Sequence, residues 1–505
     1  MAVDADWLAR SLGDAAKRVS LSERFAPRGV VRRVGDGIAI ISGLDRVRYE
    51  ELLTFDSGAF GIASDLRADA IGAILLAGAN RVREGDGVVG TGRLADLPVG
   101  PETLGRVLDP LGNPLDDGPP LSSRERLPLF RPAPEIRERR NVDQTLWTGI
   151  LAIDAAIPIG RGQRELIIGD RNVGKTALAL DVIVAQRPGD VACVYVVIGQ
   201  PMSRILALRD TLQRVGALAN TAIIAAEAST SPGMQYLAPY AGASVAEWFR
   251  DRGQHALIVY DDLTKHADAY RELALLLDRP PGREAFPGDI FYIHAELLER
   301  AAALGPEFGG GSVTALPLAE TTDGDISTYI PTNLISITDG QVFLDTARFE
   351  RDQRPAIDIG RSVSRIGAVA QPKPLRAAAR NLRIQLARFE ALEKLSRVGL
   401  EIDVATQASL NDGSLLRTLL RQNRLAARGG AEQVIMLTAV SEQWLKGVKP
   451  RSAAAFVSAL VATLRREQPE LVRKLDAGES PADGWKAAVA AIVPQVHLQV
   501  PDNGV

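Results

Sequence analysis

Residues 165–176 read Glu-Leu-Ile-Ile-Gly-Asp-Arg-Asn-Val-Gly-Lys-Thr, an apolar strand-like run that leads directly into a phosphate-binding P-loop pattern. The glycines at positions 169 and 174 let the backbone fold its N–H groups around phosphate oxygens, and the positive end of a helix beginning near Lys175 strengthens that attraction. We expect Lys175 to reach the terminal phosphates and the Thr176 hydroxyl to bind Mg²⁺. This stretch therefore predicts an α/β nucleotide-binding domain.

The sequence around the P-loop alternates between apolar strand-like runs and helical patterns. The strand-like runs lie at 166–168, 191–198, 222–226, 257–260 and 313–316. Such alternation predicts a parallel sheet whose strands are joined by right-handed crossovers. The run at 256–262 ends in two carboxylates, and we expect Asp261 to support Mg²⁺ through water, with Asp262 as the second choice.

The regions on either side of this domain have different patterns. Residues 29–99 are short apolar bursts separated by Gly and Asp, which indicates a small all-β barrel, and residues 5–18 have the spacing of an amphipathic helix. After Pro374 the strand patterns stop, and helical patterns cover 375–424 and 453–492. We predict four segments, namely an N-terminal arm at 1–24, a β-barrel at 25–95, a nucleotide-binding domain at 96–370 and a helical domain at 371–505.

The composition indicates a soluble multidomain protein, with 505 residues of which 46% are hydrophobic and 24% charged. The net charge of -3 gives no global attraction to nucleic acid or anionic lipid. No apolar run approaches the length of a membrane span, so we expect a partner to supply any membrane anchor. Cys193 is the one cysteine and we predict that it is buried, while the four histidines share no zinc-ligand spacing.

Several long stretches resemble the alpha subunits of F-type ATP synthases. They lie at 148–171, 235–242, 256–263, 279–289 and 362–367, and the resemblance runs from about Gly29 to Gln422. It implies an N-terminal β-barrel, a central RecA-like α/β P-loop domain and a C-terminal α-helical bundle. It also implies an alternating alpha3-beta3 ring with beta subunits around a central-stalk gamma subunit, and contact between the N-terminal arm and the peripheral stalk.

The resemblance further implies a location and a ligand. The location is the cytoplasmic face of a bacterial inner membrane, where the chain would be a peripheral membrane protein that reaches the membrane only through the ion-translocating sector, with no nucleic-acid partner. The ligand is ATP (or ADP) with Mg²⁺. The residues implied to bind it are Gly169, Asp170, Arg171, Asn172, Val173, Gly174, Lys175, Thr176, Gln200 and Asp261, with Arg354, Pro355 and Gln422 around the adenine.

Gln200 predicts that the chain's own site is non-catalytic. Hydrolysis needs a group that orients or deprotonates the attacking water, and in this architecture it follows the strand after the P-loop helix. Beta subunits carry a glutamate there, whereas this chain has Gln200, as alpha subunits do. A neutral amide cannot act as a general base at pH 7, although glutamine orients water in some phosphoryl-transfer sites. We therefore expect MgATP to be bound and turned over poorly or not at all.

Arg365 points to a role in a different site. It matches the family's arginine finger, which reaches the phosphates held by the neighbouring beta subunit, and Ser362 and Ser364 belong to the same loop. The resemblance thus implies that Arg365 and Ser362 are contributed to the neighbour's catalytic site, for ATP synthesis or hydrolysis coupled to ion translocation.

Departures from the family, among them the residues that follow Gln422, suggest a divergent or alternative bacterial form, and two departures concern the nucleotide site. Asn172-Val173 stands where members usually have Gln-Thr, so we expect an apolar side chain near the phosphates. Pro201-Met202 stands where Lys-Arg is common, which removes two positive charges.

Two alternative functions depend on position 200. A self-sufficient hexameric motor such as an RNA-translocating helicase, and a catalytic beta-like subunit, would each carry a glutamate there. The helicase would also need a nucleic-acid-binding face on its barrel, whereas the arginines of residues 29–99 are balanced by acidic residues.

Overall fold

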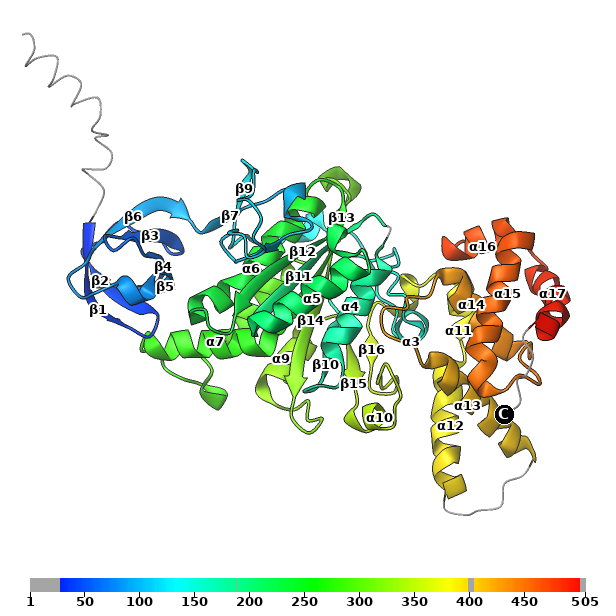
Figure 1. Ribbon diagram of the computed structural model, residues 1–505. Coiled ribbons are helices and arrows are strands. Elements are labelled where there is room, and N and C mark those ends of the chain that lie inside the picture. The colour runs from blue at the N-terminus through cyan, green and yellow to red at the C-terminus, as the bar shows by residue number, and fades with distance from the viewer. Residues whose placement is uncertain (1–27, 188, 398–403, 500–505) are drawn as a thin grey trace, which may run out of the picture.

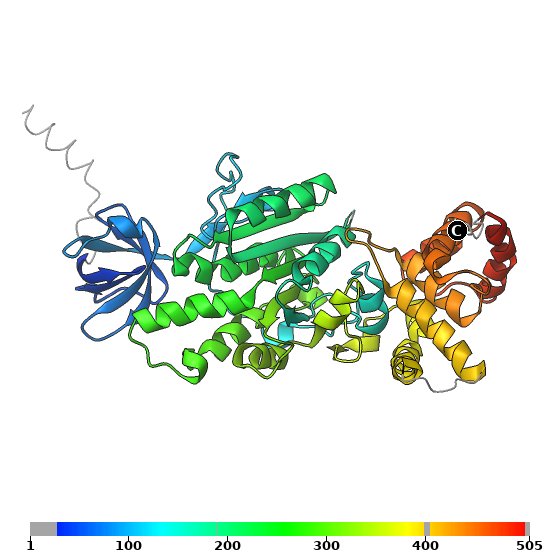
Figure 2. The same ribbon diagram turned by 60° about the horizontal axis from the view of Figure 1, so that its bottom comes forward.

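The structure is a computed structural model that describes residues 28–187, 189–397 and 404–499. The predicted helix at residues 5–18 lies outside these residues. Three regions follow one another along an elongated molecule, with the barrel at one end, the α/β domain in the middle and the helical region at the other end (Figures 1 and 2). The predicted order of architectures is therefore confirmed.

The N-terminal region is a closed barrel of six strands in the order β1-β2-β5-β4-β3-β6, with β6 pairing back onto β1. Leu53 and Phe55 alternate with partly buried neighbours along β3, as expected for a strand with one face toward a core. Closure leaves no free sheet edge. The strands are β1 (Arg28–Gly35), β2 (Ile38–Ser42), β3 (Glu51–Phe55), β4 (Phe60–Leu66), β5 (Ile71–Ala77) and β6 (Gly87–Leu94).

The central region contains an eight-stranded sheet in the order β16-β15-β10-β14-β13-β11-β12-β8. Its pairs are parallel except for β15 with β16, and all five predicted strand runs are confirmed. The turn-rich segment at 105–119 contributes the edge strand β8, which sequence analysis did not predict. The strands are β8 (Val107–Leu108), β10 (Leu166–Asp170), β11 (Val191–Gln200), β12 (Thr221–Glu227), β13 (His255–Asp261), β14 (Ser312–Thr321), β15 (Gly340–Leu344) and β16 (Val363–Ser364), and a separate pair comprises β7 (Asp96–Pro98) and β9 (Arg126–Pro128).

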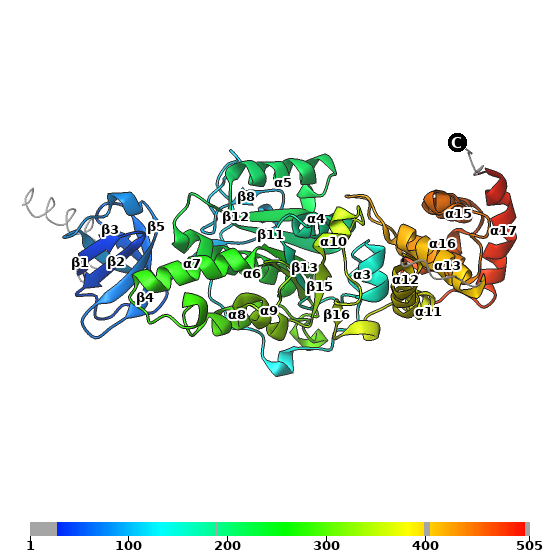
Figure 3. The same cartoon turned by 90° about the horizontal axis from the view of Figure 1, so that it is seen from below.

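Helices cover both faces of this sheet (Figure 3). Along β11 the buried side chains alternate, so that Cys193, Tyr195 and Val197 pack on the side of α4 and α5, and their neighbours pack on the side of α6 to α9. Cys193 is buried as predicted, and burial raises the pKa of its thiol to about 12. The helices are α3 (Leu151–Ala156), α4 (Lys175–Ala185), α5 (Met202–Arg214), α6 (Pro232–Arg250), α7 (Leu263–Leu276), α8 (Ile290–Glu299), α9 (Tyr329–Ile337) and α10 (Thr346–Glu350).

The C-terminal region is helical, as predicted. It includes α14, which falls between the two helical stretches expected from the sequence. Residues 430–439 of α14 are almost all buried, which is typical of a helix surrounded by others. The helices are α11 (Lys373–Ala379), α12 (Leu382–Arg397), α13 (Val404–Leu420), α14 (Gly430–Ser441), α15 (Ala453–Glu467), α16 (Pro469–Asp476) and α17 (Trp485–Gln499). Within the described ranges, no helix combines the length and apolar character that a membrane crossing requires.

Candidate nucleotide-binding site

The P-loop connects the end of β10 to the first residue of α4, Lys175. Two of its residues have left-handed backbone conformations, Asn172 with φ 65° and Gly174 with φ 102°. Glycine adopts such a conformation without strain, and Gly174 stands at the N-cap of α4, where the free N–H groups of the first helical turn face outward. The local structure is thus an anion-binding loop at a helix N-terminus.

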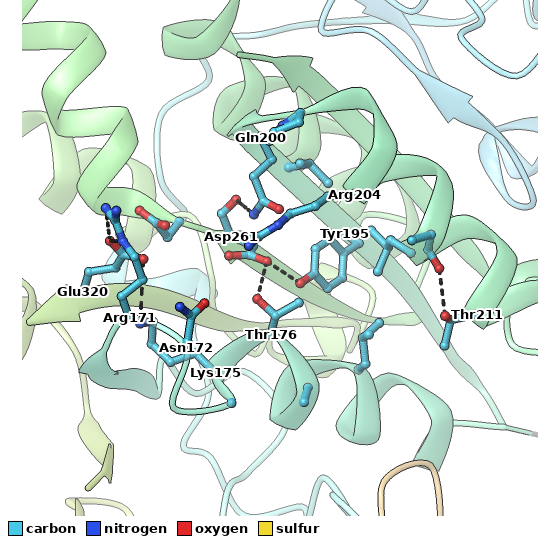
Figure 4. A pocket seen from close by; sticks show the side chains of 18 of the residues that line it. Arg171, Asn172, Lys175, Thr176, Tyr195, Gln200, Arg204, Thr211, Asp261 and Glu320 are labelled. Atoms are coloured by element: carbon cyan, nitrogen blue, oxygen red, sulfur yellow. Dashed lines mark hydrogen bonds and ion pairs between the residues drawn. The ribbon is translucent and has the colours of Figure 1, made fainter. Parts of the chain in front are cut away.

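A cavity of about 730 Å³ opens beside this loop (Figure 4). Its walls come from the P-loop, the N-terminal part of α5 and the carboxyl ends of β11 and β13, where ligands of open α/β sheets characteristically bind. The residues that line it with ionisable or amide side chains are Arg171, Asn172, Lys175, Tyr195, Gln200, Arg204, Asp261, Asp262, Lys265, Glu320 and Arg424.

Lys175 is held against the loop that it belongs to. Its ammonium donates hydrogen bonds to the carbonyl oxygens of Gly169 (2.9 Å) and Asp170 (2.7 Å), and Nζ lies 3.9 Å from a carboxylate oxygen of Glu320. The side chain is 7% exposed, and burial lowers the pKa of Lys175 although the surrounding carboxylates oppose that effect. A buried cation among N–H groups that face the same cavity is suited to phosphate oxygens.

Thr176 and Asp261 meet across the cavity floor. The Thr176 hydroxyl donates to Oδ2 of Asp261 (2.9 Å), and the Tyr195 hydroxyl donates to the same oxygen (2.7 Å), so both side chains point toward that carboxylate (Figure 4). Sequence analysis missed Tyr195, although its pairing with Val259 places it on the same sheet face as Asp261. A hydroxyl and a carboxylate facing a phosphate-binding loop are oxygen ligands of the kind that Mg²⁺ prefers.

This donor set suits Mg²⁺ better than a metal held by the protein alone. Across the described part of the chain, no group of three or more His, Cys, Asp or Glu is arranged to hold a metal ion. Mg²⁺ needs only one or two protein ligands, because substrate phosphates and water complete its octahedral shell. The residues present therefore fit a cation that arrives with the nucleotide.

Gln200 and Asp262 flank Asp261. The Gln200 side chain is buried, lines the cavity and donates to the backbone carbonyl of Asp261 (3.2 Å). Asp262 is the N-cap of α7, where its carboxylate accepts from the Lys265 N–H (2.9 Å). Burial, together with the charge of Asp261, raises the pKa of Asp262 to about 7. The end of β11 thus presents a neutral amide to the cavity.

Asp170 stabilises the P-loop from outside the cavity. Its carboxylate accepts hydrogen bonds from the Thr321 hydroxyl (2.6 Å), the Gly324 N–H (2.8 Å) and the Thr346 hydroxyl (2.7 Å). Burial raises the pKa of Asp170, but these bonds outweigh it, so the net pKa is lowered. Asp170 and Gly169 do not line the cavity, and Arg171 is 76% exposed beside Glu320.

The structure corrects the expectation for the Val173 side chain. We predicted an apolar group near the phosphates, but this side chain is 3% exposed and packs in the core between the sheet and the helices on the α4 side. It does not line the cavity. The departure at position 173 therefore changes the support of the loop, and the side chain of Asn172 remains the polar group at its surface.

The predicted adenine contacts are brought together, but away from the P-loop cavity. Arg354 and Gln422 line a second cavity of about 430 Å³, and the Gln422 N–H donates to the carbonyl of Arg354 (2.8 Å), next to the cis peptide bond that precedes Pro355. The Gln422 amide donates to Gly149 O (2.7 Å) and Ala426 O (2.8 Å). From this segment Arg424 is the residue that lines the nucleotide cavity, and sequence analysis missed it.

Positive charge is also present where Pro201-Met202 was expected to remove it. Arg204, on the first turn of α5, and Lys265, on α7, both line the nucleotide cavity. Neither was predicted from the sequence, because no short motif marks them.

Arg365 lies outside this cavity, directly after β16, which is one edge strand of the sheet. Its N–H donates to Asp339 O (2.8 Å), and its exposed guanidinium donates to Ile335 O (3.3 Å). It forms no ion pair with any residue in the described ranges. The other N–H groups of the Arg365 guanidinium can therefore donate hydrogen bonds to a second chain.

Ser362 is placed inside the loop that carries Arg365. It is 0% exposed, and its hydroxyl accepts from the Phe343 N–H (2.9 Å) and donates to Asp358 O (2.6 Å). The expectation that Ser362 itself is contributed to a neighbouring site is therefore revised, because a buried hydroxyl with both partners in its own chain can act there only by shaping the loop.

Comparisons with known proteins agree with this geometry. Residues 149–364 match the family model described as ATP synthase alpha/beta family, nucleotide-binding domain, and residues 371–496 match ATP synthase alpha/beta chain, C terminal domain. The chain is 51% identical to ATP synthase subunit alpha 2 of Burkholderia thailandensis over 468 residues, which cover 93% of this chain and 83% of that protein. It is 49% identical to ATP synthase subunit alpha 2 of Burkholderia mallei, over 97% of this chain and 72% of that protein. It is 48% identical to ATP synthase subunit alpha of Aquifex aeolicus, over 88% and 89%.

Proposed function

From the premise that this chain belongs to the ATP synthase alpha/beta family, as an alpha subunit of the F-type enzyme, we propose that it is a non-catalytic, regulatory nucleotide-binding subunit of the synthase head. It binds MgATP in its own P-loop site and supplies Arg365 to the catalytic site of the adjacent beta subunit. The observation that carries the proposal is that Gln200 lines the chain's own cavity, whereas Arg365 lies outside it and is exposed.

The chain's own residues can bind the nucleotide without cleaving it. Lys175 and the N–H groups of the P-loop would attract the phosphates, and Thr176 and Asp261 would hold Mg²⁺. The bound Mg²⁺ neutralises phosphate charge. Gln200 has an amide that donates a hydrogen bond to Asp261 O, so it orients neighbouring groups but accepts no proton at neutral pH. ATP or ADP held here stabilises or regulates the assembly.

Arg365 acts on the neighbouring site through its charge. Negative charge is spread over the transferred phosphoryl oxygens in the transition state, and a guanidinium placed beside them contributes on the order of 10³-fold or more to the rate. Within the described ranges no carboxylate oxygen lies within ion-pair distance of the Arg365 guanidinium, although its charge is felt by the buried Glu165 carboxyl, so Arg365 can meet those oxygens without first breaking a close ion pair.

The family supplies the proposed partners and location. We place the chain in an alternating alpha3-beta3 ring around gamma, with the peripheral stalk contacted by the N-terminal arm, whose residues lie outside the described ranges. The ring sits on the cytoplasmic face of a bacterial inner membrane, where ATP synthesis or hydrolysis is coupled to ion translocation through the membrane sector.

The test measures MgATP turnover and nucleotide binding separately. The isolated chain should bind MgATP with negligible turnover, and Lys175→Ala should abolish binding. The complex with the beta partner should turn over ATP, and Arg365→Ala should slow it by about 10³-fold, with Arg365→Lys intermediate because an ammonium keeps the charge without the planar fork. Robust turnover by the isolated chain, or a complex insensitive to Arg365→Ala, would refute the proposal.

A further inference from the structure

We propose that Arg383, which belongs to the C-terminal helical region, is a positioning residue that holds the Arg365 loop in place and couples that loop to the helices. This inference rests on the proposed role of Arg365. Arg383 lies at the start of α12. It would influence the reaction in the neighbouring subunit without touching that subunit, by positioning Arg365 of its own chain.

The guanidinium of Arg383 binds backbone carbonyls of two separate segments. Nη1 donates to Ile359 O (3.0 Å) and Nη2 to Ser362 O (3.1 Å), both in the segment that leads into β16. Nε and Nη2 also donate to Ala156 O (3.2 and 2.7 Å), at the end of α3. One side chain of α12 therefore links three points of the nucleotide-binding domain.

The segment held in this way carries Arg365. Ser362 is followed by the two residues of β16 and then by Arg365, so a shift of Ser362 is transmitted over a short stretch of chain. The Ser362 hydroxyl fixes the opposite side of the segment by accepting from Phe343 N–H on β15. Arg383 and β15 thus hold the segment from two directions.

A hollow at the junction makes the hydrogen bonds of Arg383 important. A cavity of about 210 Å³ lies between the two regions, lined by Ile357 and Ile359 on one side and by Arg383, Leu386 and Phe389 on the other. Ile357, Ile359 and Leu386 belong to one buried apolar cluster around this hollow, and the hydrogen bonds of Arg383 add a directional contact at its edge. Within the described ranges Arg383 forms no ion pair, and all its assigned bonds go to carbonyl oxygens, which indicates a geometric role for its planar fork.

Placement of Arg365 is sensitive to such a contact. Within the described ranges its guanidinium makes one hydrogen bond, the 3.3 Å bond to Ile335 O, so its position depends strongly on the backbone that carries it. A misplacement of about 1 Å in a catalytic constellation can cost about 10²-fold in rate. Loss of the Arg383 bonds should therefore lower turnover at the neighbouring site while leaving nucleotide affinity there largely unchanged.

The experiment uses the complex of the full chain with its beta partner and measures steady-state ATP hydrolysis. Arg383→Ala should lower kcat by about 10- to 100-fold with KM changed less than about threefold. Arg383→Lys, which keeps the charge and most of the side-chain volume, should restore part of the loss. Arg388→Ala is the matched control, because Arg388 lies on the same helix and is exposed with no hydrogen bond or ion pair in the described ranges.

The double variant Arg383→Ala, Arg365→Ala separates positioning from general destabilisation. If Arg383 acts through Arg365, the double variant is no slower than Arg365→Ala alone. The inference is overturned if Arg383→Ala has full activity, or if it slows the Arg365→Ala complex by the same factor as the wild type. If Arg365→Ala itself has no effect on turnover, the proposed function fails. That result can be told apart from the two results that overturn only the inference about Arg383. Unchanged assembly and melting temperature of the Arg383→Lys complex exclude misfolding as the cause.

Discussion

Thr176→Val tests the proposed magnesium site with little change of shape. Valine replaces the hydroxyl by a methyl group, so the 2.9 Å bond to Asp261 is lost, while the Tyr195 hydroxyl still donates to the same carboxylate oxygen. The nucleotide-free fold should therefore lose less than about 1 kcal/mol. In the complex with MgATP the variant lacks an oxygen ligand of the cation. If that contact is worth as much as a hydrogen bond to a charged group, about 1.5–3 kcal/mol, affinity for MgATP should fall about 10- to 150-fold.

Calorimetric titration of the isolated chain with MgATP, and with ATP in excess EDTA, measures this effect. The loss should be confined to MgATP, and binding of metal-free ATP should change less than about threefold, because the P-loop and Lys175 are untouched. Thr176→Ser is the matched control, since it removes the methyl group and keeps the hydroxyl. The reasoning is wrong if serine weakens MgATP binding as much as valine does, or if valine weakens both titrations equally.

Three further predictions concern buried groups. Burial raises the pKa of Asp154 to about 6 despite four hydrogen bonds. The folded state therefore favours the protonated carboxyl, and this contribution to stability is complete below the usual pKa of 3.8 and is lost as pH rises through about 6. In denaturant unfolding, the free energy of unfolding of the wild type should fall by about 1–2 kcal/mol between about pH 5 and 8, and that of Asp154→Asn should not show this fall. Arg300→Met should destabilise the fold by about 1.5–3 kcal/mol in the same measurement, because the buried Glu247 carboxylate loses its bidentate partner while Arg131 stays hydrogen-bonded to it. Cys193 should react with a thiol reagent only after unfolding, since its thiol is buried with a raised pKa.

Features encoded by neighbouring residues were predictable from the sequence. The P-loop is a local pattern, and its preceding strand and following helix were found where the pattern required them. Asp261 was predictable because it ends an apolar run, and parallel strands end at one edge of a sheet. The order of barrel, α/β domain and helices followed from changes in hydrophobic period along the chain.

Features created by contacts between distant segments were not predictable. Tyr195 reaches Asp261 only because β11 and β13 are paired in one particular register. The Val173 side chain lies in the core, and no local pattern specifies that orientation. The helix α14 is buried on nearly all sides, so it lacks the clear amphipathic period by which helices are recognised. Arg383 meets the Arg365 loop across a domain junction, which no spacing in the sequence reveals.

Asp262 is the strongest argument against a non-catalytic site. Its carboxyl group has a pKa of about 7, which suits a general base at neutral pH. Its carboxylate is, however, engaged as the N-cap of α7, accepting the Lys265 N–H. The raised pKa also depends on burial and on the charge of Asp261, and a divalent cation at Asp261 would oppose the second effect and lower the pKa of Asp262 again. Once MgATP is bound, the group is therefore a weaker base that is already committed to capping a helix. Under the proposed function we therefore expect Gln200 to leave the site without a catalytic base, and we do not expect Asp262 to replace it.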